Sequence, residues 1–110
     1  MNILNLIGKE IKAFTILDNE NNSDVIRTQQ NDKYGVIDKN GNVIVNPVYD
    51  KIEIFHRGFA IVNKKNKFGV INESGEEVIP CIYKEIYASS GKYIVFNDDN
   101  VPKIIDPNIK

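Results

Sequence analysis

The sequence predicts an all-β fold of mainly antiparallel strands, organised by an internal repeat of 34 residues. Short apolar runs rich in β-branched residues alternate with turns that contain Gly, Asn and Asp, which is typical of strands joined by hairpins. The same succession of runs and turns occurs twice, because residues 34–41 (YGVIDKNG) align with residues 68–75 (FGVINESG). Together these observations predict 34-residue units, each built as a three-stranded meander.

We expect a single domain over residues 1–110. It consists of an N-terminal cap (1–24), two repeat periods (25–58 and 59–92) and a partial C-terminal repeat (93–110). An open array normally needs three or more units. About two periods therefore predict that the ends are capped, that the meanders close into a compact sheet or barrel, or that the chain pairs with itself. A short solenoid is the alternative arrangement.

The meanders are expected over residues 25–46, 59–79 and 93–105, the last with only two strands. Pro47 and Pro80 are predicted to end the third strand of the first two meanders, because proline cannot donate to a strand ladder.

The connectors between meanders, residues 48–58 and 82–91, carry Tyr49 and Tyr83 at equivalent positions. These repeated apolar positions predict packing between meanders, in a short helical turn or an irregular strand.

The turn of each unit begins with an Asx residue, Asp38 or Asn72, and ends with Gly41 or Gly75. An Asp or Asn side chain at this position can accept hydrogen bonds from the following backbone, and glycine supplies a positive φ. Asp106 is the third equivalent. We interpret these residues as turn formers rather than as a catalytic pair or a metal site.

Gly35 and Gly69 follow an aromatic residue at the same point of each unit. A glycine inside a strand predicts a bulge or a close approach of another backbone. Substitution of either by valine is therefore expected to destabilise the fold strongly.

The N-terminal cap does not follow the repeat. Residues 14–17 predict a strand and residues 18–24 a polar loop. A short N-terminal helix is predicted by four apolar residues at helical spacing, which are Ile3, Leu4, Ile7 and Ile11.

Composition excludes several classes of protein. The net charge of −1 is not that of a duplex-binding protein, which would be clearly basic. Cys81 is the only cysteine, so no intramolecular disulfide can form and a reducing compartment is expected. No basic leader and no apolar run of ~18 residues is found, which predicts a cytoplasmic protein without a membrane partner. Only Arg27 and Arg57 accompany the lysines, a bias typical of AT-rich bacterial or phage genomes.

The repeat resembles a known family. Residues 33–50 read KYGVIDKNGNVIVNPVYD and are followed by GFAIV at residues 58–62, and a second copy starts with KFG at residues 67–69. This pattern is similar to the WG repeat, also called KWG, over about residues 24–106. Tyr34 and Phe68 stand where the family has Trp. The resemblance implies a non-catalytic repeat module that acts as a protein-interaction surface.

No residue set predicts catalysis, a metal site or a cofactor. His56 is the only histidine, and together with Cys81 it offers too few ligands for zinc. Ser89 and Ser90 lack a neighbouring base. Cys81 is interpreted as a small apolar filler.

Positions that differ between the copies are the better candidates for specificity. Residues 55–57 (FHR) stand against residues 89–91 (SSG), and Lys64-Lys65 stands against Asp98-Asp99. Tyr87 is an aromatic outside the repeat framework, which suits an interface anchor. The predicted binding residues are Phe55, His56, Arg57, Lys64, Lys65 and Tyr87.

Three hypotheses for function follow. The first is a non-catalytic binding module with an unidentified protein partner. The second is its narrower form, a small bacterial or phage inhibitor, either an immunity protein or an anti-CRISPR-type blocker of a host nuclease complex, whose partner would be a nucleoprotein effector. The third is a weak nucleic-acid binder or a small enzyme. A homo-oligomer is compatible with each of them.

Overall fold

The computed structural model describes residues 15–18 and 24–108, and all regular structure in these segments is β. The all-β prediction is confirmed, whereas the predicted N-terminal helix lies outside the described residues. The strands are β1 (Thr15–Ile16), β2 (Val25–Gln30), β3 (Lys33–Asp38), β4 (Val43–Tyr49), β5 (Lys51–Ile52), β6 (Phe59–Lys64), β7 (Lys67–Asn72), β8 (Glu77–Tyr83), β9 (Glu85–Ser89), β10 (Lys92–Phe96) and β11 (Pro102–Ile105).

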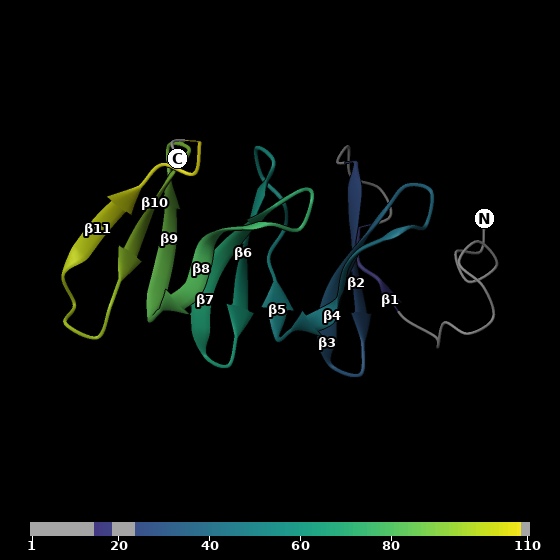
Figure 1. Ribbon diagram of the computed structural model, residues 1–110, viewed down its shortest axis with the longest axis horizontal. Coiled ribbons are helices and arrows are strands. Elements are labelled where there is room, and N and C mark those ends of the chain that lie inside the picture. Colours follow the sequence, from purple (N-terminus) through teal and green to yellow (C-terminus); the bar gives the residue numbers. More distant parts are fainter. Residues whose placement is uncertain (1–14, 19–23, 109–110) are drawn as a thin grey trace.

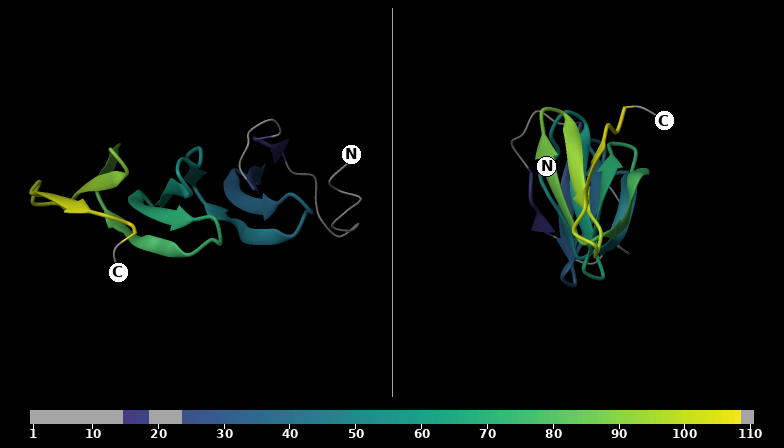
Figure 2. Two further views of the ribbon diagram at one scale, coloured as in Figure 1. Left: turned by 90° about the horizontal axis from the view of Figure 1, so that it is seen from above. Right: turned by 90° about the vertical axis from the view of Figure 1, so that its left-hand side faces the viewer.

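The strands form three antiparallel sheets that stack face to face. Their orders are β1-β2-β3-β4, β5-β6-β7-β8 and β11-β10-β9. Figure 1 shows the sheets following one another along the long axis, with β1 and β11 near opposite ends. Viewed along that axis, the sheets overlay one another (Figure 2). The molecule measures 47 × 26 × 21 Å. Of the arrangements left open by the sequence, the structure therefore adopts the short solenoid.

Each connector crosses from one sheet to the next and supplies an edge strand there. β5 pairs with β6, and β9 pairs with β10. The crossing follows a buried tyrosine, Tyr49 or Tyr83, with 4% and 7% of its surface exposed. The backbone of the next residue then donates to the new sheet, from Asp50 N to Asn63 O at 2.8 Å. The connectors are thus strands and not helical turns. With its connector strand, the second meander becomes a four-stranded sheet, and the third, which has two strands of its own, becomes a three-stranded sheet.

The prediction that Pro47 and Pro80 end their strands is wrong. β4 continues through Pro47 to Tyr49, and β8 continues through Pro80 to Tyr83. Both strands are sheet edges. On the outer side of an edge strand there is no neighbouring strand to accept an N–H, so proline costs no ladder hydrogen bond there. The sequence could not reveal this tolerance, because edge position depends on which strands pair.

The predicted close approach at the strand glycines is confirmed. The pairing of β3 with β4 shifts register between Tyr34 and Val36, so the extra residues of β4 bulge over Gly35. A β-carbon on Gly35 would lie 2.6 Å from Val45 O, and one on Gly69 would lie 2.5 Å from Ile79 O. Only glycine leaves room for these bulged edge strands.

The Asx turns also form as predicted. Asp38 Oδ1 accepts the backbone N–H groups of Asn40 and Asn42, both at 2.9 Å. Asn72 Oδ1 accepts those of Ser74 at 3.1 Å and Glu76 at 2.9 Å. The side-chain amide of Asn42 also donates to Asp38, and these bonds hold the pKa of the Asp38 carboxyl below its ordinary value. The local turn chemistry accounts for both residues without a further role.

One strand of the repeat aligns differently from the sequence prediction. A constant spacing of 34 places Tyr93 under Phe59, but the buried residues of β6 and β10 match at a spacing of 33. Ala60 corresponds to Tyr93, and Val62 to Val95, with each of these four side chains at most 6% exposed. The first connector holds one more residue between Ile52 and its turn, which shifts the register. Because side chains alternate along a strand, a slip of one residue exchanges the two faces.

The core consists of two apolar layers, one between each pair of neighbouring sheets. Val36 of the first sheet packs with Ile52 and Val62 of the second, all with no exposed surface. On the other side of the second sheet, Val70 packs with Val95 of the third. The second sheet is therefore buried on both faces, as expected for the middle layer of a stack.

Candidate functional site

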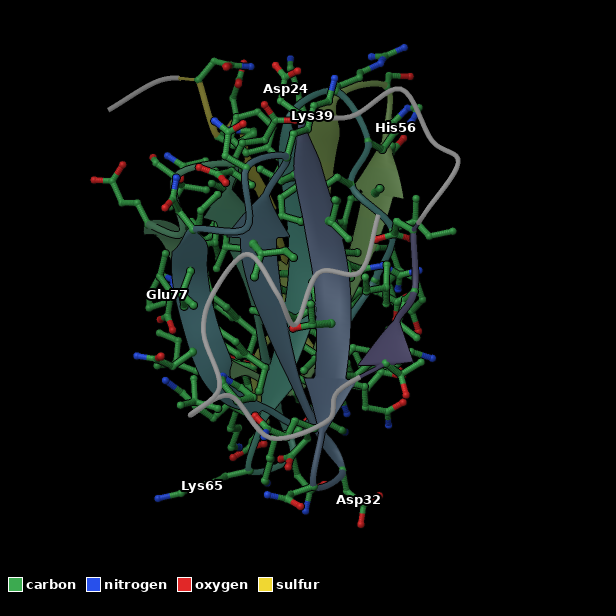
Figure 3. All side chains as sticks on the ribbon, turned by 90° about the vertical axis from the view of Figure 1, so that its right-hand side faces the viewer. Asp24, Asp32, Lys39, His56, Lys65 and Glu77 are labelled. Carbon is green, nitrogen blue, oxygen red and sulfur yellow. The ribbon has the colours of Figure 1, made fainter. Side chains whose placement is uncertain are left out.

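The candidate site lies at one end of the strands, where the second and third sheets meet. Each sheet turns there through two residues with positive φ, which are Arg57 and Gly58 in the second sheet and Ser90 and Gly91 in the third. In Figure 3, His56 lies at this end together with Asp24 and Lys39, whereas Asp32 and Lys65 lie at the opposite end. The two turns face each other across the stack.

A cleft of about 430 Å³ opens between these turns. We call it the turn cleft. It is lined by His56, Arg57, Phe59, Ala88, Ser89, Ser90, Gly91, Lys92, Tyr93, Asp106 and Asn108.

Backbone hydrogen bonds hold the first wall of the turn cleft in place. His56 N donates to Phe59 O at 2.8 Å, and Phe59 N donates back to His56 O at 3.1 Å. The closed turn between them fixes Arg57 at φ 55°. Its side chain reaches the other wall, since Arg57 Nη1 lies 3.0 Å from the position that a β-carbon on Gly91 would take. The guanidinium therefore spans two repeats.

Positive charge predominates in the turn cleft. Arg57 and Lys92 are exposed, and neither has a carboxylate partner within the described part of the chain. The one acid in the lining is Asp106, whose Oδ1 accepts the backbone N–H of Asn108 at 2.9 Å. Ser89 and Ser90 add hydroxyl groups that can donate or accept hydrogen bonds. The arrangement provides a small, open surface of hydrogen-bond donors with fixed backbone positions.

The structure separates the six residues that the sequence proposed for binding. His56 and Arg57 line the turn cleft, but Phe55 packs against the core layer between the first and second sheets. Phe55 is therefore a structural residue rather than an exposed anchor. Tyr87 is 52% exposed on the outer surface of the third sheet, away from both of these places.

The two predicted lysines lie in the turn at the far end of the second sheet. Lys64 Nζ is 3.3 Å from Glu77 Oε2 and 5.2 Å from the centre of the Tyr49 ring. Lys65 is exposed, and its backbone N–H donates to Asp50 at 2.8 Å. The neighbouring Lys67 lies 3.9 Å from Asp98 of the third sheet. Acidic partners thus offset the charge of this loop, and the loop is not part of the turn cleft.

Nine of the eleven lining residues, Lys92, Asp106 and Asn108 among them, were not predicted for binding. Lys92 lies between the predicted connector (82–91) and the predicted meander (93–105), and Asp106 was interpreted as a turn former. Their approach to Arg57 depends on the stacking of the second and third sheets, for which the linear pattern carries no signal. The contrast between residues 55–57 and 89–91 was the useful signal, because both segments contribute to the lining.

The largest pKa shifts occur outside the turn cleft, around Glu77. Burial raises the pKa of the Tyr49 hydroxyl, and the hydrogen bond that it donates to Glu77 Oε2 at 2.6 Å raises it further. Burial and the nearby Glu77 raise the pKa of the Cys81 thiol to about 11. Burial opposes ionisation of Glu77, but hydrogen bonds from Tyr49 and Lys64 outweigh it, so the pKa of this carboxyl is lowered. This cluster joins the first two sheets and serves the fold.

Residues 15–18 and 24–108 contain no group of three or more His, Cys, Asp or Glu side chains that could hold a metal ion. They also contain no helix that could cross a membrane.

The aromatic-Gly element identifies the repeat. Tyr34 faces Tyr49 across β3 and β4, and Phe68 faces Tyr83 across β7 and β8. No curated protein and no solved structure matches the chain. The family described as "WG containing repeat" matches twice, over residues 34–68 and 68–100. Because the two matches together span more than half of the chain, the protein belongs to the family of WG-containing repeat proteins.

Proposed function

We propose that the protein is a non-catalytic binding module, and that its turn cleft receives an acidic segment of a protein partner. The observation that carries this proposal is the meeting of Arg57 and Lys92 at one cleft, where both are exposed and lack a carboxylate partner among the described residues. Membership of a repeat family supports the choice of a module that presents a surface.

The chemistry of the turn cleft favours carboxylate groups. A guanidinium offers a planar pair of N–H donors that matches a carboxylate, and such charge-assisted bonds are among the stronger hydrogen bonds in proteins. Arg57 is held in a turn whose backbone is closed by two hydrogen bonds, which lowers the entropy lost when it binds. An acidic side chain or a chain-terminal carboxylate of the partner would satisfy Arg57, with Lys92 as the second contact.

A dedicated inhibitor is the narrower form of this proposal. An immunity protein or an anti-CRISPR-type blocker of a nuclease complex would use the same cleft on a toxin or nuclease. Its test is functional. The captured enzyme should lose activity when one equivalent of the protein is added, and an enzyme that keeps its activity would limit the role to an adaptor.

Nucleic-acid binding is less well supported. Two lysines around the turn between β6 and β7 are close to acids, since Lys64 lies near Glu77 and Lys67 near Asp98. A phosphate backbone would have to compete with these carboxylates. Binding through several phosphates would also give a steep salt dependence. RNA affinity that is low and nearly independent of salt is the expected result.

Affinity capture with matched variants tests the placement of the surface. Wild-type protein, Arg57→Ala and Lys65→Ala are immobilised and exposed to lysate of the source organism, and retained proteins are quantified by mass spectrometry. Arg57 and Lys65 are closely matched, because each is an exposed cation at a left-handed turn position, with φ 55° and 54°. Capture should fall by at least about tenfold for Arg57→Ala and remain unchanged for Lys65→Ala.

The opposite pattern would contradict the proposal. If Lys65→Ala loses the partner while Arg57→Ala retains it, binding takes place at the other end of the strands. Thermal melts of the three proteins provide the folding control, since neither substitution removes a buried side chain. Arg57→Glu should abolish capture by repelling the acidic segment, and retention by this variant would exclude a carboxylate as the bound group.

A further inference from the structure

The outer surface of the third sheet carries an apolar row that no other sheet among residues 15–18 and 24–108 covers. Tyr87, Ile94 and Ile104 are direct neighbours across β9, β10 and β11. Phe96 extends the row, with its ring in edge contact with that of Tyr87 at 6.0 Å between centroids. Tyr87 is 52% exposed and Ile104 is 67% exposed. We call these four residues the terminal face.

The positions equivalent to the terminal face lie in the core in the second sheet. Ile94 and Ile104 correspond to Ile61 and Val70 of the second sheet, by the pairing of β10 with β11 and of β6 with β7. Val70 has no exposed surface, and both residues belong to the core layer between the second and third sheets. The terminal face is therefore built like a surface that packs on another sheet.

The terminal face is also more apolar than its counterpart inside the stack. Tyr87 corresponds to Glu53 and Phe96 corresponds to Asn63, because each holds the same place beside the Ile of the central strand. Two polar positions have thus become aromatic on a sheet surface that no other described sheet covers. Aromatic residues of this kind are enriched at protein interfaces, and simple repetition of the unit would have kept the polar residues.

We infer that the terminal face binds the terminal face of a second copy of this chain, giving a two-fold dimer. The occupant is a sheet of the same type, which continues the mode of packing that already joins the sheets within the chain. The charges fit this arrangement. Glu85 lies beside Phe96 at one end of the face, and Lys92 lies beside Ser89 at the other end. A two-fold axis across the strands brings Glu85 of each copy to Lys92 of the other.

The size of the surface sets the expected strength. The stack has a cross-section of 26 × 21 Å, so two such faces in contact bury roughly 1,100 Å² in total, near the lower limit for a specific interface. The dimer should therefore be weak and dependent on concentration. A two-fold contact is also closed, because it uses the same surface on both copies.

Sedimentation analysis of the full chain over roughly 5 to 500 µM tests the dimer. The average mass should rise with concentration and level off at twice that of the monomer. Ile104→Asp should remain a monomer at every concentration. The matched control is Ile54→Asp, an isoleucine of nearly equal exposure, 65% against 67%, which should dimerise like the wild type. A wild-type protein that stays monomeric would overturn the inference, as would growth beyond the dimer, which indicates head-to-tail stacking.

A charge exchange tests the orientation. Glu85→Lys and Lys92→Glu should each weaken the dimer by at least tenfold, because each places like charges together twice. The double variant restores both pairs and should recover the wild-type dimerisation constant. If the double variant is weaker than either single variant, the two copies are not related by the proposed axis. Lys92 also lines the turn cleft, so Lys92→Glu changes both surfaces. Capture of a partner by the turn cleft is therefore measured separately with Arg57→Ala, which leaves the terminal face unchanged, and either proposal can fail without the other.

Discussion

Gly69 lies so close to the carbonyl of Ile79 that a β-carbon on Gly69 would stand 2.5 Å from Ile79 O. The same hypothetical atom would be 2.8 Å from Cys81 N and 2.9 Å from Cys81 Sγ. The neighbours are mainly backbone, which cannot rotate away as a flexible side chain can. Gly69 therefore permits the bulge of β8, and the relation recurs between Gly35 and Val45 in the preceding unit.

Gly69→Ala should destabilise the protein by about 3 kcal/mol, because the added methyl group forces the edge strand to move. That corresponds to a melting temperature lower by roughly 10–20 °C, measured by circular dichroism. Gly58→Ala is the control. No atom lies within 4 Å of its β-carbon position, but its φ of 86° is strained for alanine, which costs about 1–2 kcal/mol. Equal losses for the two variants would contradict the close approach as the cause.

Tyr49→Phe should cost about 1 kcal/mol at neutral pH, because it removes the hydrogen bond to the partly exposed Glu77 carboxylate. Since the folded state lowers the pKa of Glu77 from 4.5, this stabilisation is present above pH 4.5 and is lost as the pH falls through the lowered value. Urea titrations should therefore show a difference from wild type that shrinks in acid.

Tyr83→Phe is the matched control for this measurement. Tyr83 holds the same place in the next repeat and is similarly buried, at 7% against 4% exposed for Tyr49. Its hydroxyl has no hydrogen-bond partner among the described residues. Its replacement should change stability by less than about 0.5 kcal/mol at any pH. If the control shows the same acid dependence as Tyr49→Phe, Glu77 is not the titrating group.

Cys81 should react slowly with thiol reagents. Its pKa of about 11, raised by burial from 9.0, reduces the thiolate fraction near pH 8 about 100-fold, and the thiolate is the reactive form. Labelling with iodoacetamide in native buffer should therefore be about two orders of magnitude slower than in urea. Equal rates in the two conditions would show that the thiol is not protected by the fold.

The edge strand β11 should resist pairing with a further strand. Pro102 and Lys103 occupy the positions that Phe68 and Gly69 hold in β7. Proline lacks an N–H, and at Gly69 the bulge of β8 leaves no room for a β-carbon, so a lysine at the equivalent position 103 is incompatible with such a bulged strand. A synthetic peptide with the β8 sequence should bind the Pro102→Phe/Lys103→Gly variant and not the wild type, as measured by calorimetry.

The single variant Pro102→Phe is the control for this prediction. It supplies the N–H but keeps the side chain of Lys103, so the peptide should remain unbound. Binding of the peptide to the wild-type protein would show that the edge is open as it stands, and that the two residues do not protect it from strand addition.

Much of the local structure could be predicted from the sequence. The Asx turns at Asp38 and Asn72 depend on hydrogen bonds within a few residues. The bulges at Gly35 and Gly69 depend on glycine, which inside a strand indicates a close approach of another backbone. The aromatic-Gly element also identified the family. These features recur in both units, so each prediction was supported twice by independent stretches of sequence.

The candidate site was only partly predictable. The sequence singled out His56 and Arg57 as residues that differ between the copies, and both line the turn cleft. It grouped them with Lys64 and Lys65, which lie at the far end of the strands. The direction of each strand decides at which end of the sheet a residue lies. That direction is known only once the pairing of β5 with β6 is known.

The sequence by itself determined the β class, the repeat and the turns, because these follow from short-range backbone preferences. The tertiary structure decided the rest through contacts between distant backbones. It made β4 and β8 edges, which allows Pro47 and Pro80, and it shifted β6 and β10 to a spacing of 33 through one added residue in the first connector. It also stacked the sheets, which brings Arg57 and Lys92 into the lining of one cleft. No local preference specifies which sheet faces which, since that choice is made by the burial of apolar faces shared between units.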